Sequence, residues 1–356
     1  MAIDHVRVYS GLPAGGDTAG IFLTRWVTHF VAPAFCFFAG VGIWFMAKRL
    51  DGGAVRRFLV SRGLLLVLLE LTLIRFLWAF SVGPDFMLAG VIWMLGWCMV
   101  LMAPFAKMRA RVGWLGVAIV VLQPLFFVVG NVLPGSVQGV WAFVYFVDAR
   151  PALGFNVLYV IVPWIGVMLA GYGFGKLLEL PEVARHRMLY RVGLGMTAAF
   201  LLIAPLLAAM NAEPPADGSP MRALWMRALD QRKYPASPLF LLMTLGPMIA
   251  LIPWAERAKG WGVRALEMFG RVPMWYYLMH LVVIHSLAVV VTYLHTRQFG
   301  FDWFRTAPYT QVPDEGRWSL LLLYIVWAGA IAVLYPTCLW YARRKKEKPA
   351  RWMHYI

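Results

Sequence analysis

The stretch Arg25-Trp-Val-Thr-His29-Phe-Val-Ala-Pro33-Ala-Phe-Cys-Phe-Phe-Ala-Gly40 is apolar enough to enter a bilayer, yet it begins with a cation and an imidazole. Arg25 and His29 are four residues apart, so a helix places both on one face, about one turn apart. Pro33 has no N–H, so the carbonyl of His29 loses its helical partner and a kink is expected there. The pattern predicts a kinked membrane helix whose polar end faces a cavity. The alternative is a water-facing helix end capped by Arg25.

Composition places the whole chain in the membrane-protein class. Of the 356 residues 61% are hydrophobic and 14% are charged, and the mean hydropathy is +0.69. A soluble domain carries about 25% charged residues. Apolar runs of about twenty residues recur, which indicates an all-α, polytopic integral membrane bundle. The three cysteines lie in apolar runs without metal-ligand spacing, so neither a disulfide framework nor a metal site is expected.

The apolar runs predict about nine complete spans within one domain that covers residues 1–356. A partial helix over residues 1–9 precedes them and is expected to be the outer end of a helix whose inner part is missing. The predicted spans are 27–46, 57–78, 86–106, 112–131, 155–175, 190–210, 237–254, 272–293 and 319–341.

Basic residues are distributed unevenly between the connecting segments. Two thirds of the 33 Lys and Arg residues lie in alternate segments, at 47–62, 107–111, 176–191, 255–271 and 342–351. By the positive-inside rule these segments and the C-terminus are cytoplasmic. The net charge of +16 therefore reflects membrane topology, and no nucleic-acid partner is expected.

Three outer loops are expected to be long, over residues 132–154, 211–236 and 294–318. The second becomes amphipathic, which predicts a short surface helix near 220–231. The third carries Trp303, Tyr309 and Trp318, which suit an interfacial aromatic belt or a sugar platform.

The candidates for functional ionisable groups inside the predicted spans are Glu70, Arg75, His280 and His285. Each costs roughly 2.5 kcal/mol or more at the bilayer centre, so each is expected to face a cavity or a partner. Glu70 and Arg75 lie about 140° apart on a helix, so Glu70 needs a donor from another helix. For each histidine a hydrogen-bonded core role and a functional role both remain open.

A second polar group, Asp4, His5 and Arg7, marks the partial first helix. Asp4 and His5 point about 100° apart on a helix, so Asp4 does not orient His5. Asp4 and Arg7, spaced i and i+3, are expected to pair. His5 is then left to face a cavity, or is an ordinary interfacial histidine.

Several stretches along the chain, taken together, resemble the heparan-alpha-glucosaminide N-acetyltransferase-like family, and within it a bacterial branch of transmembrane acyltransferases. They are Ala2–Arg7, Phe22–Gly40, Leu69–Arg75, Val91–Gly96, Pro163–Met168, Lys233–Gly246 and Phe269–Pro273 leading to His280.

The resemblance implies an acyltransferase of the bacterial inner membrane. It would pass an acyl group, usually acetyl, from cytoplasmic acyl-CoA through a helical pore to an amine or hydroxyl, often of a sugar, on the outer side. The family's chemical centre is a histidine near the outer end of the pore. By spacing it would fall near Ala19, where this chain has none, so His5 is the best match in role and His29 the second. Arg25 and Asp4 complete the catalytic candidates.

The remaining roles also follow from the resemblance. Lys233 and Tyr234 would bind the acceptor, and Arg56, Arg57 and Arg271 would hold the phosphates of CoA. Expected partners are the lipid bilayer, a glycan or small-molecule acceptor and a second copy of the chain, and no metal is expected.

Two other functions remain open. One is a proton-coupled transporter or flippase that uses the same polar cavity, with Glu70 and His285 as a proton relay. The other is a non-catalytic membrane scaffold, in which Glu70, His280 and His285 would be replaceable by apolar residues.

Overall fold

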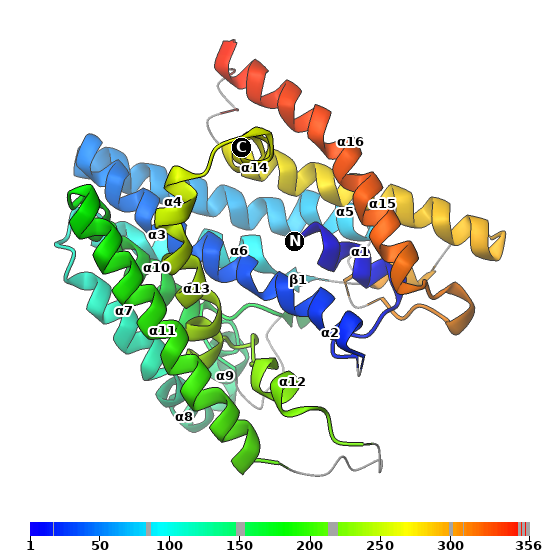
Figure 1. The fold of residues 1–356 in the computed structure, drawn as a ribbon, viewed down its shortest axis with the longest axis horizontal. Helices are drawn as coiled ribbons and strands as arrows, with labels where there is room; N and C mark the ends of the chain where they lie inside the picture. The colour runs from blue at the N-terminus through cyan, green and yellow to red at the C-terminus, as the bar shows by residue number, and fades with distance from the viewer. Residues whose placement is uncertain are drawn as a thin grey trace. The chain divides into compact units, whose positions relative to one another are not determined.

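Helices make up nearly all of the regular structure in the computed structural model of this chain (Figure 1). The structure describes all residues except 17, 83–86, 147–153, 213–219, 299–301, 309, 348–349, 351–352 and 354–356. Within that part, the only strands are β1 (Leu88–Ala89) and β2 (Asn156–Val157), which pair in parallel. The predicted all-helical class is confirmed.

The chain divides into two compact units. The first unit comprises Met1–Thr28, Thr72–Phe86 and Arg257–Ile356, and the second comprises His29–Leu71 and Met87–Glu256. Each is described by itself.

In the first unit the short N-terminal helix α1 packs against the two long helices α15 and α16 (Figure 1). Helix α5 packs against α15 as well. Val6 and Tyr9 are the buried side of α1, and Gly11, with a φ of 73°, ends that helix. The helices of this unit are α1 (Ala2–Ser10), α2 (Ala19–Trp26), α5 (Arg75–Ala79), α14 (Trp261–Arg271), α15 (Pro273–Thr296) and α16 (Leu320–Glu347), with 3₁₀ turns η6 (Asp302–Thr306) and η7 (Asp314–Gly316).

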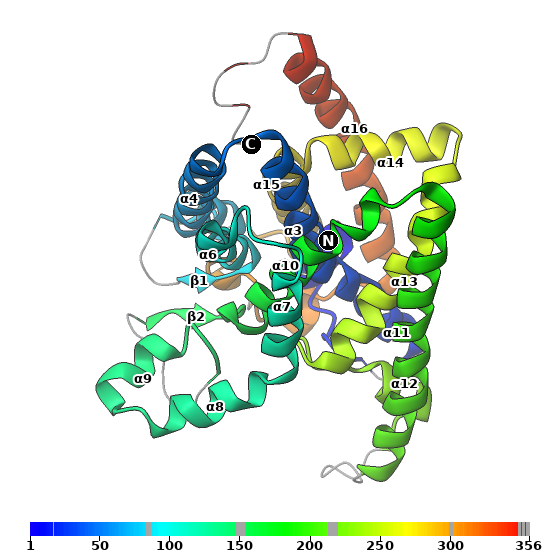
Figure 2. The ribbon, with the colours of Figure 1, turned by 90° about the vertical axis from the view of Figure 1, so that its left-hand side faces the viewer.

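In the second unit α10 (Ile161–Phe174) is central and packs against α3 (Val31–Arg49), α6 (Val91–Met102) and α7 (Val112–Val121), while α4 (Gly52–Leu69) packs against α6 (Figure 2). Glycines allow this close packing, since a Cβ built on Gly40 would lie 2.0 Å from the carbonyl oxygen of Met168. The other helices are α8 (Gln123–Val132), α9 (Gly135–Trp141), α11 (Glu182–Met210), α12 (Leu224–Leu229) and α13 (Pro238–Arg257). The shorter turns of this unit are η3 (Ala103–Phe105) and η5 (Leu177–Glu179). The 3₁₀ turn η1 (Val27–Phe30) and the π-helical turn η2 (Glu70–Ile74) each begin in one unit and end in the other.

Six helices of the described chain are long and apolar enough to cross a membrane, and the bent pair α7–α8 would make a seventh. The bend of 63° falls next to Pro124, which has no N–H to continue the helical hydrogen bonds. The multi-pass membrane class is therefore confirmed, but the count of nine spans is not. The predicted span 86–106 is shorter, Val91–Phe105, and the predicted span 57–78 consists of α4, the π-helical turn and α5.

One local prediction is confirmed, and the kink expected at Pro33 stays a prediction. The helix geometry changes to 3₁₀ over Val27–Phe30, which includes His29, and α3 then continues through Pro33. The expected surface helix near 220–231 is α12, Leu224–Leu229. In the third outer loop, Tyr309 lies outside the described residues.

Candidate active site

Two histidines that are 275 residues apart form a hydrogen bond in the first unit. Nε2 of His280, on α15, lies 2.6 Å from Nδ1 of His5, on α1, and the two rings stack with centroids 4.7 Å apart. His280 has no exposed surface, whereas His5 is half-buried. Nδ1 of His280 lies 3.0 Å from the carbonyl oxygen of Tyr276, one turn earlier on α15.

The hydrogen-bond partners assign the protons of both rings. A carbonyl oxygen only accepts, so Nδ1 of His280 carries the hydrogen. In a neutral imidazole the other nitrogen then accepts, so Nδ1 of His5 donates to Nε2 of His280. Nε2 of His5 is left as the unprotonated nitrogen of the pair, which is the form that a base or a nucleophile requires.

Aromatic rings fix the position of this pair. Trp78, on α5, lies against His5 with ring centroids 4.5 Å apart, and Tyr276 stacks on His280 at 5.4 Å with the rings nearly parallel. Tyr277 meets His5 with its edge at 6.5 Å. Because these contacts come from α5 and α15, the ring of His5 depends on the packing of three helices.

The predicted pairing of Asp4 is confirmed. Oδ1 of Asp4 lies 3.0 Å from Nε of Arg7, and Nη1 of Arg7 donates to the carbonyl of Leu12 at 2.9 Å. Asp4 thus helps to hold the end of α1, while His280 holds the ring of His5.

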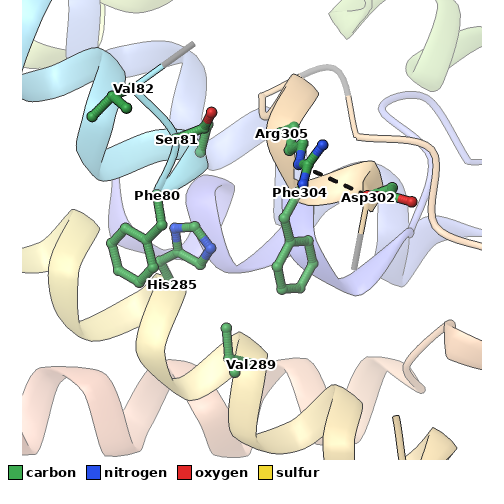
Figure 3. A pocket seen from close by; sticks show the side chains of 9 residues that line it. Phe80, Ser81, Val82, His285, Val289, Asp302, Phe304 and Arg305 are labelled. Carbon is green, nitrogen blue, oxygen red and sulfur yellow. Dashed lines mark ion pairs between the residues drawn. The ribbon is translucent and has the colours of Figure 1, made fainter. Parts of the chain in front are cut away.

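His285 lies farther along α15, beside a cavity of about 460 Å³ (Figure 3). Its Nδ1 is 3.1 Å from the carbonyl oxygen of Leu77, and the ring of Phe80 stacks on it at 3.6 Å. Asp302 and Arg305, on η6, also line this cavity, with 3.8 Å between the carboxylate and the guanidinium (Figure 3).

Tyr9 connects the surroundings of the two buried histidines. Its ring lies 5.0 Å from that of His285 and 6.1 Å from that of Trp78, and its hydroxyl donates to the carbonyl of Trp78 at 2.5 Å. The rings of Tyr9 and Trp78 thus lie between His285, which lines the cavity, and His5.

Glu70 is the buried carboxylate of the second unit. One oxygen accepts from the backbone N–H groups of Ile92 and Trp93, at 3.0 and 3.2 Å, where α6 begins. This confirms that Glu70 needs a donor from another helix. A carboxylate at a helix start also interacts favourably with the helix dipole, so a structural role of Glu70 is well supported.

The other predicted site residues lie in both units. His29 is buried beside Phe240, with ring centroids 5.4 Å apart, and Lys233 is buried over the rings of Tyr159 and Tyr234. The first unit contains Asp4, His5, Arg25, Arg75, Arg271, His280 and His285, and the second contains His29, Arg56, Arg57, Glu70, Lys233 and Tyr234.

Arginines predicted to bind CoA lie at the surface. Arg56 and Arg57 are exposed on α4, and Arg271 is exposed at the end of α14, where it lies 3.5 Å from the carboxylate of Glu267. Among the described residues, no group of three or more His, Cys, Asp or Glu side chains is placed to hold a metal ion.

Sequence reasoning missed the aromatic residues around the histidines of this site. No local spacing in the sequence connects Trp78 to His5, or Tyr9 and Phe80 to His285. The one available signal was Tyr276 four residues before His280, since a helix brings that carbonyl near the ring.

Comparison with protein families gives one match. Residues 14–200, just over half of the chain, match the model described as heparan-alpha-glucosaminide N-acetyltransferase, catalytic. This range includes Arg25, His29, Glu70 and Arg75, and it excludes His5 and His280. Comparisons with curated proteins and with solved structures found no match. The chain belongs to the heparan-alpha-glucosaminide N-acetyltransferase family.

Proposed function

We propose that this multi-pass membrane transferase moves an acyl group, acetyl in the simplest case, from cytoplasmic acyl-CoA to an amine or hydroxyl of an acceptor on the outer side. A sugar is the acceptor that the family suggests. The observation that carries the proposal is the distance of 2.6 Å between Nδ1 of His5 and Nε2 of His280, because the neutral tautomers that satisfy it and the carbonyl of Tyr276 put the unprotonated nitrogen of His5 at Nε2. The family assignment supports the reaction class.

His5 acts either as a base or as a nucleophile. In direct transfer the acceptor attacks the thioester carbon, its proton passes to Nε2 of His5, and the C–S bond breaks as the CoA sulfur takes that proton. In the two-step route Nε2 of His5 attacks the thioester carbon, the C–S bond breaks and CoA leaves as the thiolate. The acceptor then attacks the acyl carbon, the bond from that carbon to Nε2 breaks, and the acceptor's proton passes to the thiolate.

His280 is a positioning residue in either route. When Nε2 of His5 gains a proton or an acyl group, the hydrogen on Nδ1 of His5 is already aimed at Nε2 of His280. The positive charge is therefore shared with a second imidazole, whose own Nδ1–H is anchored on the carbonyl of Tyr276. Arg25 or Arg75 would stabilise the oxyanion, and Asp4, through its ion pair with Arg7, would hold the helix that carries His5.

Substrate contacts follow the predicted topology. Arg56 and Arg57, which are exposed on α4, are proposed to hold the phosphates of CoA. Arg271, whose exposed guanidinium lies 3.5 Å from the carboxylate of Glu267, is a further candidate for the same role. Lys233 and Tyr234 are proposed to bind the acceptor. The uneven distribution of Lys and Arg supports a cytoplasmic C-terminus. The proposal also places the protein in a bacterial inner membrane and takes the whole chain as one functional domain.

A transfer assay tests the proposal. Purified protein in lipid nanodiscs is incubated with labelled acetyl-CoA and a panel of amino sugars and sugar alcohols. Transfer by the wild-type protein and its loss in His5→Ala are expected. His295→Ala, an exposed histidine at the end of α15, is the matched control and should keep full activity. Full transfer by a well-folded His5→Ala protein would remove His5 from the mechanism.

A proton-coupled transporter or flippase is the second candidate, favoured by the position of His285 beside a cavity that lies two rings from His5. It predicts flux of a solute or lipid across sealed vesicles that depends on the pH gradient and is indifferent to acyl-CoA. Acyl-CoA-dependent product without such flux rejects it.

A further inference from the structure

The second unit contains a cavity of about 750 Å³ that the proposed reaction does not use. It lies where the end of α3, the start of α7, the end of α10 and the beginning of α11 meet. Its basic and aromatic lining residues are Lys48, Arg109, Arg111, Lys176, Trp44 and Trp114.

Close helix packing fixes the segment that carries two of these arginines. A Cβ built on Gly173 would lie 2.6 Å from the carbonyl oxygen of Ala110 and 2.7 Å from Cα of Gly113, so α10 and the start of α7 touch through their backbones. The hydroxyl of Tyr172 donates to the carbonyl of Met108 at 2.9 Å. Arg109 and Arg111 are thus held at the mouth of the cavity.

The cavity is lined by more basic than acidic side chains. Glu179 is the one carboxylate among the lining residues, and it is already bound by Nε1 of Trp44 at 2.7 Å and by Nζ of Lys48 at 3.3 Å. Among the described residues, Arg109, Arg111 and Lys176 form no ion pair. The lining therefore carries four cations and one carboxylate, and guanidinium groups bind phosphate oxygens in particular.

The rim of the cavity is suited to lipid. Trp114 is 75% exposed and Leu180 is exposed, and both lie next to the cations. Tryptophan is enriched where a membrane helix meets the headgroups. Three of the five segments predicted to be cytoplasmic, 47–62, 107–111 and 176–191, supply the four cations.

We propose that this cavity binds the phosphate of an anionic phospholipid headgroup, with the acyl chains lying beside Trp114. Basic pockets between membrane helices on the cytoplasmic side bind such headgroups. The cavity faces the cytoplasmic leaflet if the orientation proposed above holds. The binding of the phospholipid does not depend on the proposed acyl transfer. A soluble phosphate compound would use the same cations, so the test separates the two sources.

The test measures lipid binding by the delipidated protein in detergent. Native mass spectrometry and thermal unfolding are recorded with added phosphatidylglycerol, phosphatidylcholine or inorganic pyrophosphate. Wild-type protein is expected to bind phosphatidylglycerol more tightly than phosphatidylcholine. The double variant Arg109→Gln/Arg111→Gln should bind phosphatidylglycerol roughly 10- to 30-fold more weakly, since each cation near an anionic lipid contributes about a fivefold factor.

The matched control removes the same charge from the same side of the chain. Arg187→Gln/Arg191→Gln changes two exposed arginines of α11 that do not line the cavity, and it should bind as the wild type does. If the double variant fails to fold, Lys176→Gln takes its place with an expected loss of about fivefold.

Two results would overturn the proposal. One is unchanged preference for phosphatidylglycerol in folded variants of the cavity. The other is displacement of the lipid by pyrophosphate at equal phosphate concentration, which would assign the cavity to a soluble phosphate. Neither result depends on whether the protein transfers acyl groups.

Discussion

Nδ1 of His5 lies 2.6 Å from Nε2 of His280. The other ring nitrogen of His280, Nδ1, is hydrogen-bonded to the carbonyl oxygen of Tyr276. The arrangement is a base held by a second imidazole that is itself held by the backbone. Because α1 contributes His5 and α15 contributes both other groups, the packing of α1 on α15 sets the distance.

Replacing His280 tests this positioning role. His280→Phe removes the acceptor for Nδ1–H of His5 while keeping an aromatic ring, so kcat should fall by about 100-fold, within the range that a positioned base contributes. KM for acyl-CoA should change little, since His280 is proposed to act through His5. His280→Gln offers an amide oxygen as acceptor and should restore part of kcat.

The comparison between these two variants separates positioning from folding. If His280 had only a structural role, both variants would be less stable and would contain a smaller active fraction. The kcat per folded molecule would then be the same in His280→Phe and His280→Gln. Active-site titration with labelled acetyl-CoA, together with thermal unfolding, supplies the two readouts. Equal kcat in His280→Phe and wild type would contradict the role given to His280.

Glu70 offers a test of stability within the second unit. Glu70→Leu leaves the N–H groups of Ile92 and Trp93 without their buried acceptor, so the free energy of unfolding should fall by about 2–4 kcal/mol. Glu70→Gln keeps one oxygen that accepts both hydrogen bonds and should cost about 1 kcal/mol. Reversible unfolding in detergent measures both. A proton-relay role would instead make Glu70→Gln lose function at unchanged stability.

A pair of glycines on α3 tests the packing at the centre of the second unit. A Cβ at Gly40 would lie 2.0 Å from the carbonyl oxygen of Met168, whereas a Cβ at Gly42 would have no neighbour within 4 Å. Gly40→Ala should destabilise by roughly 1–3 kcal/mol because α3 and α10 must separate. Gly42→Ala should be neutral or stabilise by up to about 1 kcal/mol, because alanine favours the helix.

Melting temperatures of the two variants in one detergent give the readout. The expected order has Gly42→Ala at or above the wild type and Gly40→Ala below it. Equal melting temperatures would show that α3 and α10 are not in backbone contact.

Local patterns in the sequence predicted the parts of the structure that depend on neighbours along the chain. The pairing of Asp4 with Arg7 follows from i, i+3 spacing, and the apolar runs located most of the helices. The need of Glu70 for a donor on another helix follows from the cost of burying a carboxylate.

Contacts between distant segments could not be predicted in this way. His5 and His280 are 275 residues apart, and neither residue's surroundings in the sequence identify the other. The count of nine spans is not confirmed among the described residues, and apolar composition reveals neither a bend such as that at Pro124 nor a π-helical turn such as Glu70–Ile74. The span predicted to start at residue 86 begins at Val91 in the structure. Apolar composition does not reveal that Leu88–Ala89 form a strand that pairs with Asn156–Val157.

Asp51 provides a pH-dependent test at the start of α4, outside the spans. Its Oδ1 accepts the N–H of Ala54 at 2.9 Å, and this hydrogen bond lowers the pKa of the carboxyl below its usual value. A lowered folded-state pKa means that the ionised cap stabilises the protein at neutral pH, and that this contribution is lost as the pH falls through the folded-state pKa. Asp51→Ala should therefore melt below the wild type at pH 7, and the difference should shrink in acid below pH ~4, the usual range of an aspartate.

Asp51→Asn keeps a capping oxygen without a titrating group, so its melting temperature should stay near that of the wild type at pH 7. A constant difference between Asp51→Ala and wild type down to the lowest accessible pH would show that the carboxylate does not cap α4.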